Sequence, residues 1–230
     1  MIARFAGRPP SYWGLEAPRV LTYLPQGPAG IALTLDFCGG PGGDGADLTI
    51  IDLLRRLQVP ATLFLNGRWI TANPALTQDL AADSLFEIAN HGTNHYPLSV
   101  SGAAAYGISG TEGAGSVYDE IMINNARLTE LTGKRPRFFR PGTAYLDDVA
   151  ADICLALDLI PAGFSLNADG GATYPAVMVA AETGAAVPGS IIIAHGNHPG
   201  SGTGPGLAQA LPHLLAKGRT FTTLSTAMTP

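Results

Sequence analysis

Short segments rich in β-branched and aromatic residues recur along the chain, and most are separated by stretches with the apolar spacing of an amphipathic helix. Segments of this kind that are bounded by turn residues predict seven strands, at residues 31–36, 61–66, 85–89, 137–140, 161–165, 190–195 and 220–224. Strands that alternate with helices are typical of a parallel sheet. An eight-stranded barrel of this type has roughly 250 residues. Seven strands in 230 residues therefore predict an α/β fold, a distorted seven-stranded (β/α) barrel of parallel strands.

The remaining pattern predicts helices and one long loop. Helices are expected at 48–57, from Asn73-Pro74 onward, at 116–131, at 146–157 and at 206–217. The segment 97–115, rich in Gly, Ala and Ser, is the longest piece without a predicted element and is a candidate flap over a site. We interpret residues 1–230 as a single catalytic domain in which residues 1–30 are a lead-in segment that packs against the barrel.

Composition and charge exclude several classes of function. Hydrophobic residues make up 46% of the chain and charged residues 13%, which favours a sizeable core. A net charge of −5 without a Lys/Arg cluster argues against a nucleic-acid partner. The sequence contains no run of about 18 apolar residues, so membrane insertion is not predicted. Residues 1–10 lack the apolar middle of a signal peptide, but a leader already removed would leave the same sequence, so the compartment stays open. The oligomeric state is not indicated either.

Polar, ionisable residues stand at or just beyond the ends of the predicted strands. They are Asp36, His91, Arg140, Asp169 and His195. In parallel α/β folds, ligands bind at the carboxyl ends of the strands. Each residue alone also has a structural interpretation, such as a turn cap for Asp36 or a core histidine for His195. Together they predict an active site at one end of the barrel.

A pair of histidines carries the strongest chemical signal. His91 and His95 lie four residues apart, so that two imidazoles can bind one metal ion, although each could also be a hydrogen-bonded loop histidine. Imidazole nitrogen with a carboxylate oxygen suits zinc or a similar divalent ion, and three protein ligands leave one position for water. We expect Arg140 to pair with Asp36, and Asp169 to orient His195. Cys38 is interpreted as a small residue that fills a turn, and a disulfide between the two cysteines is not favoured.

Five motifs follow one another along the chain: Asp36 at a strand end, His91-x-x-x-His95, Arg140-Pro141, Asp169, and His195 after an apolar strand. In this order they resemble the five motifs of the polysaccharide deacetylases, carbohydrate esterase family four. The resemblance runs from about residue 31 to residue 224. It implies a distorted seven-stranded barrel, a divalent metal (usually zinc), and removal of acetyl groups from N-acetylated sugars. It also implies roles for individual residues: Asp36 as general base, Arg140 as its partner, His91 and His95 as metal ligands, His195 as general acid, Asp169 as the residue that tunes it, and the backbone N–H near Thr143 as an oxyanion donor.

One position departs from the family pattern. The first motif usually has two adjacent aspartates, the second of which binds the metal, whereas this chain has Phe37 after Asp36. The chain is similar to a variant branch with an Asp-x-Cys-Gly-Gly first motif and another aspartate a few residues later. Asp47, Asp44 and Asp36 are then candidates for the third ligand. We expect Asp47, which directly precedes a predicted helix, although that position also suits a helix N-cap.

The expected function is therefore metal-dependent hydrolysis of an N-acetyl amide on an acetylated carbohydrate, chitin-like or peptidoglycan-like. Two alternatives stay open. One is an amidohydrolase on the same fold that acts on a small cyclic amide, which requires a closed pocket instead of a groove. The other is a sugar-binding relative that lost catalysis through Phe37. The polymer cannot be named, because loops determine it.

Overall fold

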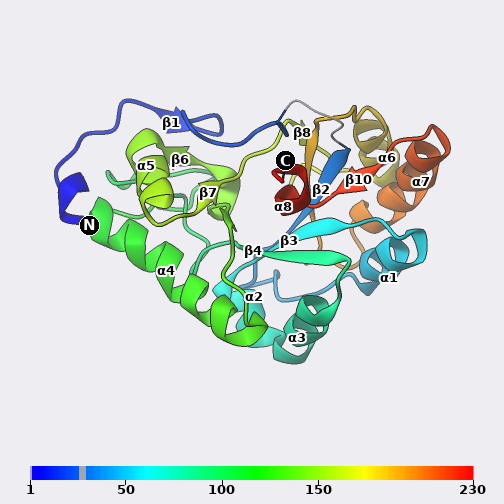
Figure 1. The fold of residues 1–230 in the computed structure, drawn as a ribbon, viewed down its shortest axis with the longest axis horizontal. Coiled ribbons are helices and arrows are strands. Elements are labelled where there is room, and N and C mark those ends of the chain that lie inside the picture. The colour runs from blue at the N-terminus through cyan, green and yellow to red at the C-terminus, as the bar shows by residue number, and fades with distance from the viewer. Residues whose placement is uncertain (1, 26–29, 230) are drawn as a thin grey trace.

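A curled sheet of parallel strands, surrounded by helices, forms the centre of the molecule (Figure 1). The computed structural model describes residues 2–25 and 30–229. The strand order is β7-β5-β4-β3-β2-β9-β8, with β10 beside β2, and every pair is parallel. The strands are β2 (Ile31–Phe37), β3 (Ala61–Leu65), β4 (Phe86–Asn90), β5 (Phe138–Phe139), β7 (Ile160–Pro161), β8 (Leu166–Asn167), β9 (Ile191–His195) and β10 (Phe221–Thr222). The predicted distorted (β/α) barrel is confirmed.

One predicted strand, residues 161–165, is wrong in detail. The structure has two short strands there, β7 at one edge of the sheet and β8 at the other. The residues between them carry the chain from one edge to the other, and Leu21 of the lead-in segment pairs with Ala162 in the gap. Leu21 donates its N–H to Pro161 and accepts one from Gly163. A pattern of alternating residues cannot distinguish one strand from a segment that pairs with two different neighbours.

Helices lie around the sheet, with α4 along one side and the paired helices α6 and α7 on the opposite side (Figure 1). The α-helices are α1 (Leu48–Leu57), α2 (Gly67–Ala72), α3 (Pro74–Ala82), α4 (Gly113–Thr132), α5 (Asp148–Ala156), α6 (Ala176–Gly184), α7 (Thr203–Ala216) and α8 (Leu224–Ala227). Two short 3-10 helices are η1 (Ile2–Phe5) and η2 (Gly142–Ala144). The sequence pattern did not predict α2, α6 and α8. α2 begins directly at the end of β3, because the Asn66 side chain accepts a hydrogen bond from the Arg68 N–H.

Residues 2–25 of the lead-in segment contact the sheet and its connections. In addition to the Leu21 bridge, β1 (Trp13–Gly14) pairs antiparallel with β6 (Leu146–Asp147), and Tyr23 pairs with Ser190 at the start of β9. The segment 97–115, in contrast, is not without structure. Ser101 pairs with Glu112, Ala105 with Ile108, and α4 already begins at Gly113. These cross-loop hydrogen bonds depend on residues far apart in the segment, so local periodicity does not indicate them.

Strand β2 shows how the sheet separates site residues from core residues. Successive side chains of a strand point to opposite faces. Leu33, Leu35 and Phe37 belong to the apolar layer between the sheet and the helices, where Phe37 packs on Trp69 with ring centroids 4.6 Å apart. A Cβ at Gly196 would lie 2.3 Å from the Phe37 ring, so glycine is needed there. Asp36 therefore points to the opposite face, away from Phe37.

Both cysteines, Cys38 and Cys154, are free. No helix in the described ranges is both long enough and apolar enough to span a membrane.

Candidate functional site

The ends of β2 and β5 bring Asp36 and Arg140 into a buried ion pair. The Arg140 Nη1 donates to Asp36 Oδ1 at 2.7 Å, as the sequence analysis expected, and to Thr34 Oγ1 at 2.9 Å. Its Nη2 donates to the Gly163 carbonyl at 2.7 Å and its Nε to the Ala162 carbonyl at 3.2 Å. Each nitrogen of the buried guanidinium thus donates at least one hydrogen bond, as a charge in a low-dielectric interior requires.

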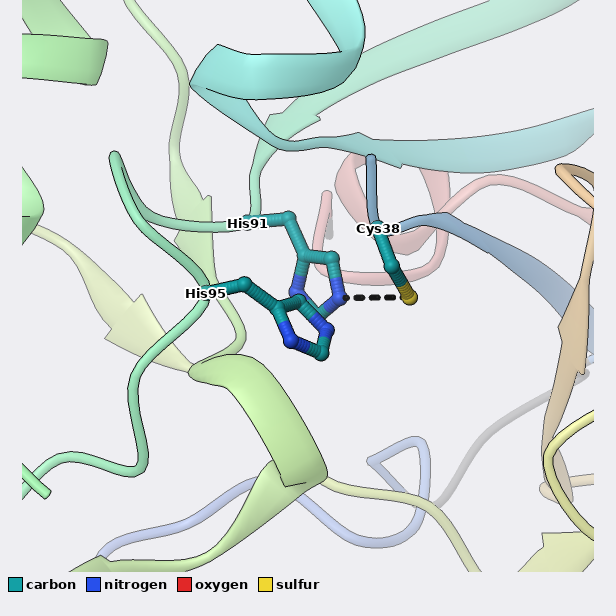
Figure 2. Close-up of side chains that lie close together, drawn as sticks. All are labelled: Cys38, His91 and His95. Carbon is teal, nitrogen blue, oxygen red and sulfur yellow. Dashed lines mark hydrogen bonds between the residues drawn. The ribbon is translucent and has the colours of Figure 1, made fainter. Parts of the chain in front are cut away.

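Next to this pair, Cys38, His91 and His95 form a compact cluster (Figure 2). One potential ligand atom from each residue lies within 4.8 Å of the others. Cys38 Sγ is 3.7 Å from His91 Nε2, and that same nitrogen is 3.6 Å from Asp36 Oδ2. The two imidazole rings are 4.8 Å apart at 83°. The two histidines thus lie together, as their spacing predicted, and they share their site with a sulfur.

The hydrogen bonds of the two histidines fit a metal ion. His91 Nδ1 lies 2.8 Å from the Arg140 carbonyl. Since a carbonyl can only accept, Nδ1 carries the proton, and Nε2 directs its lone pair toward the cluster. A backbone carbonyl on the distal ring nitrogen is the usual arrangement for a metal-bound histidine. His95 Nε2 is buried and has no hydrogen-bond partner among the residues that the structure describes. One thiolate and two imidazoles are ligands that zinc prefers.

The electrostatic environment favours a thiolate at Cys38. Burial raises the pKa of the thiol, but His95, His195 and His91 around the sulfur outweigh burial and hold the Cys38 pKa well below its ordinary value. A thiolate is the form of cysteine that binds metals. The cluster therefore combines a negative sulfur and two imidazoles beside a buried carboxylate.

The expected third ligand, Asp47, is not brought to the histidines. Its carboxylate caps α1, where Oδ1 accepts the Thr49 N–H at 3.1 Å. Asp44 is also engaged elsewhere, since its Oδ1 accepts the Gly40 N–H at 2.7 Å. Among the described residues, neither aspartate joins the cluster of potential ligand atoms, and Cys38 takes that place. The sequence signal that could have indicated Cys38 is its position two residues after Asp36. That step keeps both side chains on the same face of the strand.

His195 and Asp169 form the second half of the site. His195 Nδ1 lies 2.9 Å from Asp169 Oδ1, and the His195 backbone N–H donates to Oδ2 at 2.7 Å. Burial lowers the pKa of His195, but the hydrogen bond to Asp169 and the Cys38 sulfur raise it, and the pKa lies well above its ordinary value. Thr203 also donates its hydroxyl to Asp169 Oδ2, at 2.9 Å. Sequence reasoning missed Thr203, because a hydroxyl at a helix start carries no distinct pattern.

A buried carboxylate of α4 supports the loop that holds the histidines. Glu120 accepts the Asn94 N–H with both oxygens at 3.0 Å, and the Tyr96 N–H at 3.2 Å. Burial, opposed by these backbone hydrogen bonds, raises its pKa to about 7. A Cβ at Gly92 would lie 2.4 Å from Glu120 Oε1, so only glycine fits there. The sequence signal that could have indicated Glu120 is its position as an acidic residue on the apolar face of a helix.

The turn after Arg140 closes over the loop of His95. At Gly142 a Cβ would lie 2.1 Å from the His95 carbonyl oxygen. His95, Thr143 and Ala144 all have left-handed backbones, with φ of 64°, 67° and 60°. Such conformations are uncommon for these residue types and concentrate at functional sites. The oxyanion role of the Thr143 N–H stays a prediction.

Comparison with known proteins gives a consistent picture. A family model for polysaccharide deacetylases matches residues 25–159. The chain is 27% identical over 220 residues to a peptidoglycan-N-acetylglucosamine deacetylase of Bacillus cereus, a match that covers 92% of this chain and 94% of that protein. It is also 27% identical over 104 residues to the uncharacterized protein YlxY of Bacillus subtilis, of which the match covers 29%.

Two solved structures share the fold. One is a CE4 family pseudoenzyme from Bacillus anthracis, with a TM-score of 0.76, 18% identity, and coverage of 93% of this chain and 70% of that one. The other is a peptidoglycan N-acetylglucosamine deacetylase crystallised with a naphthalenyl hydroxamate, with a TM-score of 0.75, 24% identity, and coverage of 91% and 92%.

We predict that Glu120→Ala weakens zinc binding by roughly 10- to 100-fold, the range found when groups that support metal ligands are removed. The substitution leaves the N–H groups of Asn94 and Tyr96 without their acceptor, so the loop no longer holds His95 in place. Glu120→Gln, which keeps one oxygen of the same shape, should lose less affinity. Competition titration with a chromogenic chelator measures both. Equal zinc affinity in wild-type protein and Glu120→Ala would contradict this role.

Proposed function

The chain belongs to the polysaccharide deacetylase family, and on that premise we propose that it is a metal-dependent hydrolase that removes N-acetyl groups from an acetylated glycan. The substrate class is chitin-like or peptidoglycan-like. The observation that carries the proposal is the Cys38–His91–His95 cluster, which lies 3.6 Å from the Asp36 carboxylate on one side. His195 is among the groups that lower the pKa of Cys38.

In this proposal Cys38, His91 and His95 hold one divalent ion, of which zinc fits the donors best. When bound, the ion supplies Lewis acidity that polarises the acetyl carbonyl and makes a water molecule more acidic. Asp44 and Asp47 have no part in this site, since their carboxylates bind backbone N–H groups elsewhere.

Asp36 is the general base. Arg140 occupies its Oδ1, while Oδ2 faces the cluster near His91 Nε2. The carboxylate can take a proton from the attacking water. Because Arg140 is itself held by Thr34 and two backbone carbonyls, it fixes the direction of the carboxylate.

His195 is the general acid. Its raised pKa keeps the imidazole protonated, and its Nδ1 is occupied by Asp169. Nε2 is then the nitrogen that can give a proton to the departing amine. In this proposal the oxyanion that develops at the carbonyl accepts a hydrogen bond from the N–H of Thr143, a residue with a left-handed backbone.

The metal assignment gives a contrast between two residues. We predict that Cys38→Ser weakens zinc binding by well over tenfold, because a hydroxyl replaces the thiolate ligand. Asp47→Ala should keep the affinity and lower the free energy of unfolding by about 1 kcal/mol, as expected for loss of a helix cap. The measurements are elemental analysis, chelator competition and thermal unfolding. With cobalt in place of zinc, wild-type protein should also show a thiolate-to-cobalt charge-transfer band that Cys38→Ser lacks. The opposite pattern, with zinc lost only in Asp47→Ala, would reinstate the carboxylate.

The activity itself is tested by acetate release from acetylated chitin oligomers and from peptidoglycan fragments, by zinc-loaded protein. We predict that Asp36→Asn and His195→Ala each reduce kcat by roughly 10²- to 10⁴-fold, the usual contribution of a general base or acid, while each keeps its bound metal. Zinc-loaded wild-type protein that binds these glycans but releases no acetate would instead identify a sugar-binding relative without catalysis.

The pH dependence follows from the pair of His195 and Asp169. A general acid must be protonated, so activity falls as pH rises through the pKa of His195. The hydrogen bond to Asp169 is a main cause of the raised His195 pKa. Removal of the Asp169 carboxylate therefore lowers the pKa of His195. We therefore predict that Asp169→Asn shifts the alkaline limb of the kcat/KM profile to lower pH. An alkaline limb that does not move would show that another group donates the proton.

A further inference from the structure

Three aromatic side chains from distant parts of the chain meet beside the site. The ring of Tyr145 lies 5.7 Å from that of Trp13, at an interplanar angle of 45°, and 5.5 Å from that of Tyr106, at 89°. Trp13 comes from β1, Tyr106 from the loop before α4, and Tyr145 from the end of the turn that follows Arg140. We refer to Trp13, Tyr106 and Tyr145 as the aromatic platform.

The backbone attaches this platform to the catalytic end of the barrel. Tyr145 belongs to the turn whose Gly142 lies directly against the His95 carbonyl. The Tyr145 carbonyl accepts the N–H of Leu98, three residues after His95. Trp13 is held by the pairing of β1 with β6, where it lies opposite Asp147. The platform is therefore continuous with the loop that carries the histidines.

The platform is not part of the hydrophobic core. Tyr106 is 76% exposed, whereas Trp13 and Tyr145 are half-buried beneath it. Exposed aromatic groups that gather at one place mark binding sites more often than isolated ones do. The segments that carry them, residues 11–14, 96–112 and 142–148, contain no Lys, Arg or His. Of their three acidic groups, Asp148 accepts hydrogen bonds from Ser11, Asp147 caps α5, and Glu112 is exposed. These segments have no cationic group that could bind a polyanion, so the surface suits an uncharged ligand.

We propose that the aromatic platform binds a neutral pyranose ring of the glycan, next to the sugar whose acetyl group reaches the metal cluster. One face of a pyranose carries C–H groups that pack on an aromatic ring, while its hydroxyls stay in contact with water and with the tyrosine hydroxyls. Rigid Trp and Tyr rings provide this type of contact with little loss of side-chain entropy. The inference rests on the proposed function for the identity of the substrate, but binding can be measured without turnover.

The tryptophans of the chain provide a direct signal. There are two, Trp13 on the platform and Trp69, which is fully buried. Titration of the Asp36→Asn protein with N-acetylglucosamine oligomers of increasing length, and separately with peptidoglycan fragments, should change the emission of Trp13. Trp13→Phe in the same background should bind with similar affinity by calorimetry, and the fluorescence change should vanish.

Tyr106→Ala should weaken oligomer binding by roughly two- to tenfold, the loss expected for one aromatic contact. In the active enzyme it should raise KM for long oligomers and reduce their advantage over the single sugar. Tyr106 is mostly exposed, so this change should not affect folding. The matched control is Tyr23→Ala, since Tyr23 is 61% exposed and pairs with Ser190 at the opposite end of β9. It should change nothing.

The outcomes for the platform and for the proposed function are separable. Oligomer binding that Tyr106→Ala weakens, without acetate release by the wild-type protein, would support the platform and refute the hydrolase. Acetate release with equal oligomer affinity in wild-type protein, Tyr106→Ala and Trp13→Ala would overturn the platform and leave the hydrolase intact. A preference for chitin oligomers over peptidoglycan fragments, or the reverse, then identifies which glycan the platform accepts.

Discussion

The buried ion pair between Asp36 and Arg140 connects most parts of the site. Its guanidinium joins the end of β2 to the crossing segment between β7 and β8, through Thr34 and the carbonyls of Ala162 and Gly163. The backbone carbonyl of the same arginine accepts the Nδ1–H of His91. Loss of one partner from such a pair leaves an uncompensated buried charge and costs about 3–5 kcal/mol. Arg140 thus fixes the direction of the Asp36 carboxylate, the tautomer of His91, and the connection between the two edges of the sheet.

Around this pair the site is held in a strained conformation by contacts outside it. His95 and Thr143 have left-handed backbones, which cost of order 1–3 kcal/mol each and persist only where the surroundings impose them. Glu120 imposes the first through the N–H groups on both sides of His95, and the close contact of Gly142 with the His95 carbonyl couples the second to it. The loop that carries His95 and the turn at 142–144 are therefore held as one unit.

The donors of the cluster give the site a chemical bias. A thiolate with two imidazoles is a softer set than a carboxylate with two imidazoles, and soft ligands favour zinc over magnesium, calcium or manganese. The phenylalanine at position 37 does not reduce this set, because it belongs to the helix-facing layer of β2, packed on Trp69. A substitution that looks like a lost ligand in the sequence is, in the structure, a core residue next to Cys38, a potential ligand of another type.

The sequence by itself determined the alternation of strands and helices, the parallel sheet, and the polar strand ends that converge at one end of it, including the pairing of Asp36 with Arg140 and of Asp169 with His195. These features follow from short-range periodicity and from the geometry that all parallel sheets share. Only the tertiary structure decided the third donor, the supporting role of Glu120, the division of the segment 161–165 between two edges, and the meeting of Trp13 with Tyr145. Each of these depends on how loops close and on which distant backbone N–H groups need an acceptor. A helix N-terminus claims the carboxylate of Asp47, whereas the sulfur of Cys38 lies against two histidines more than fifty residues away. Local sequence patterns carry no information about such contacts, because the chain must fold before they exist.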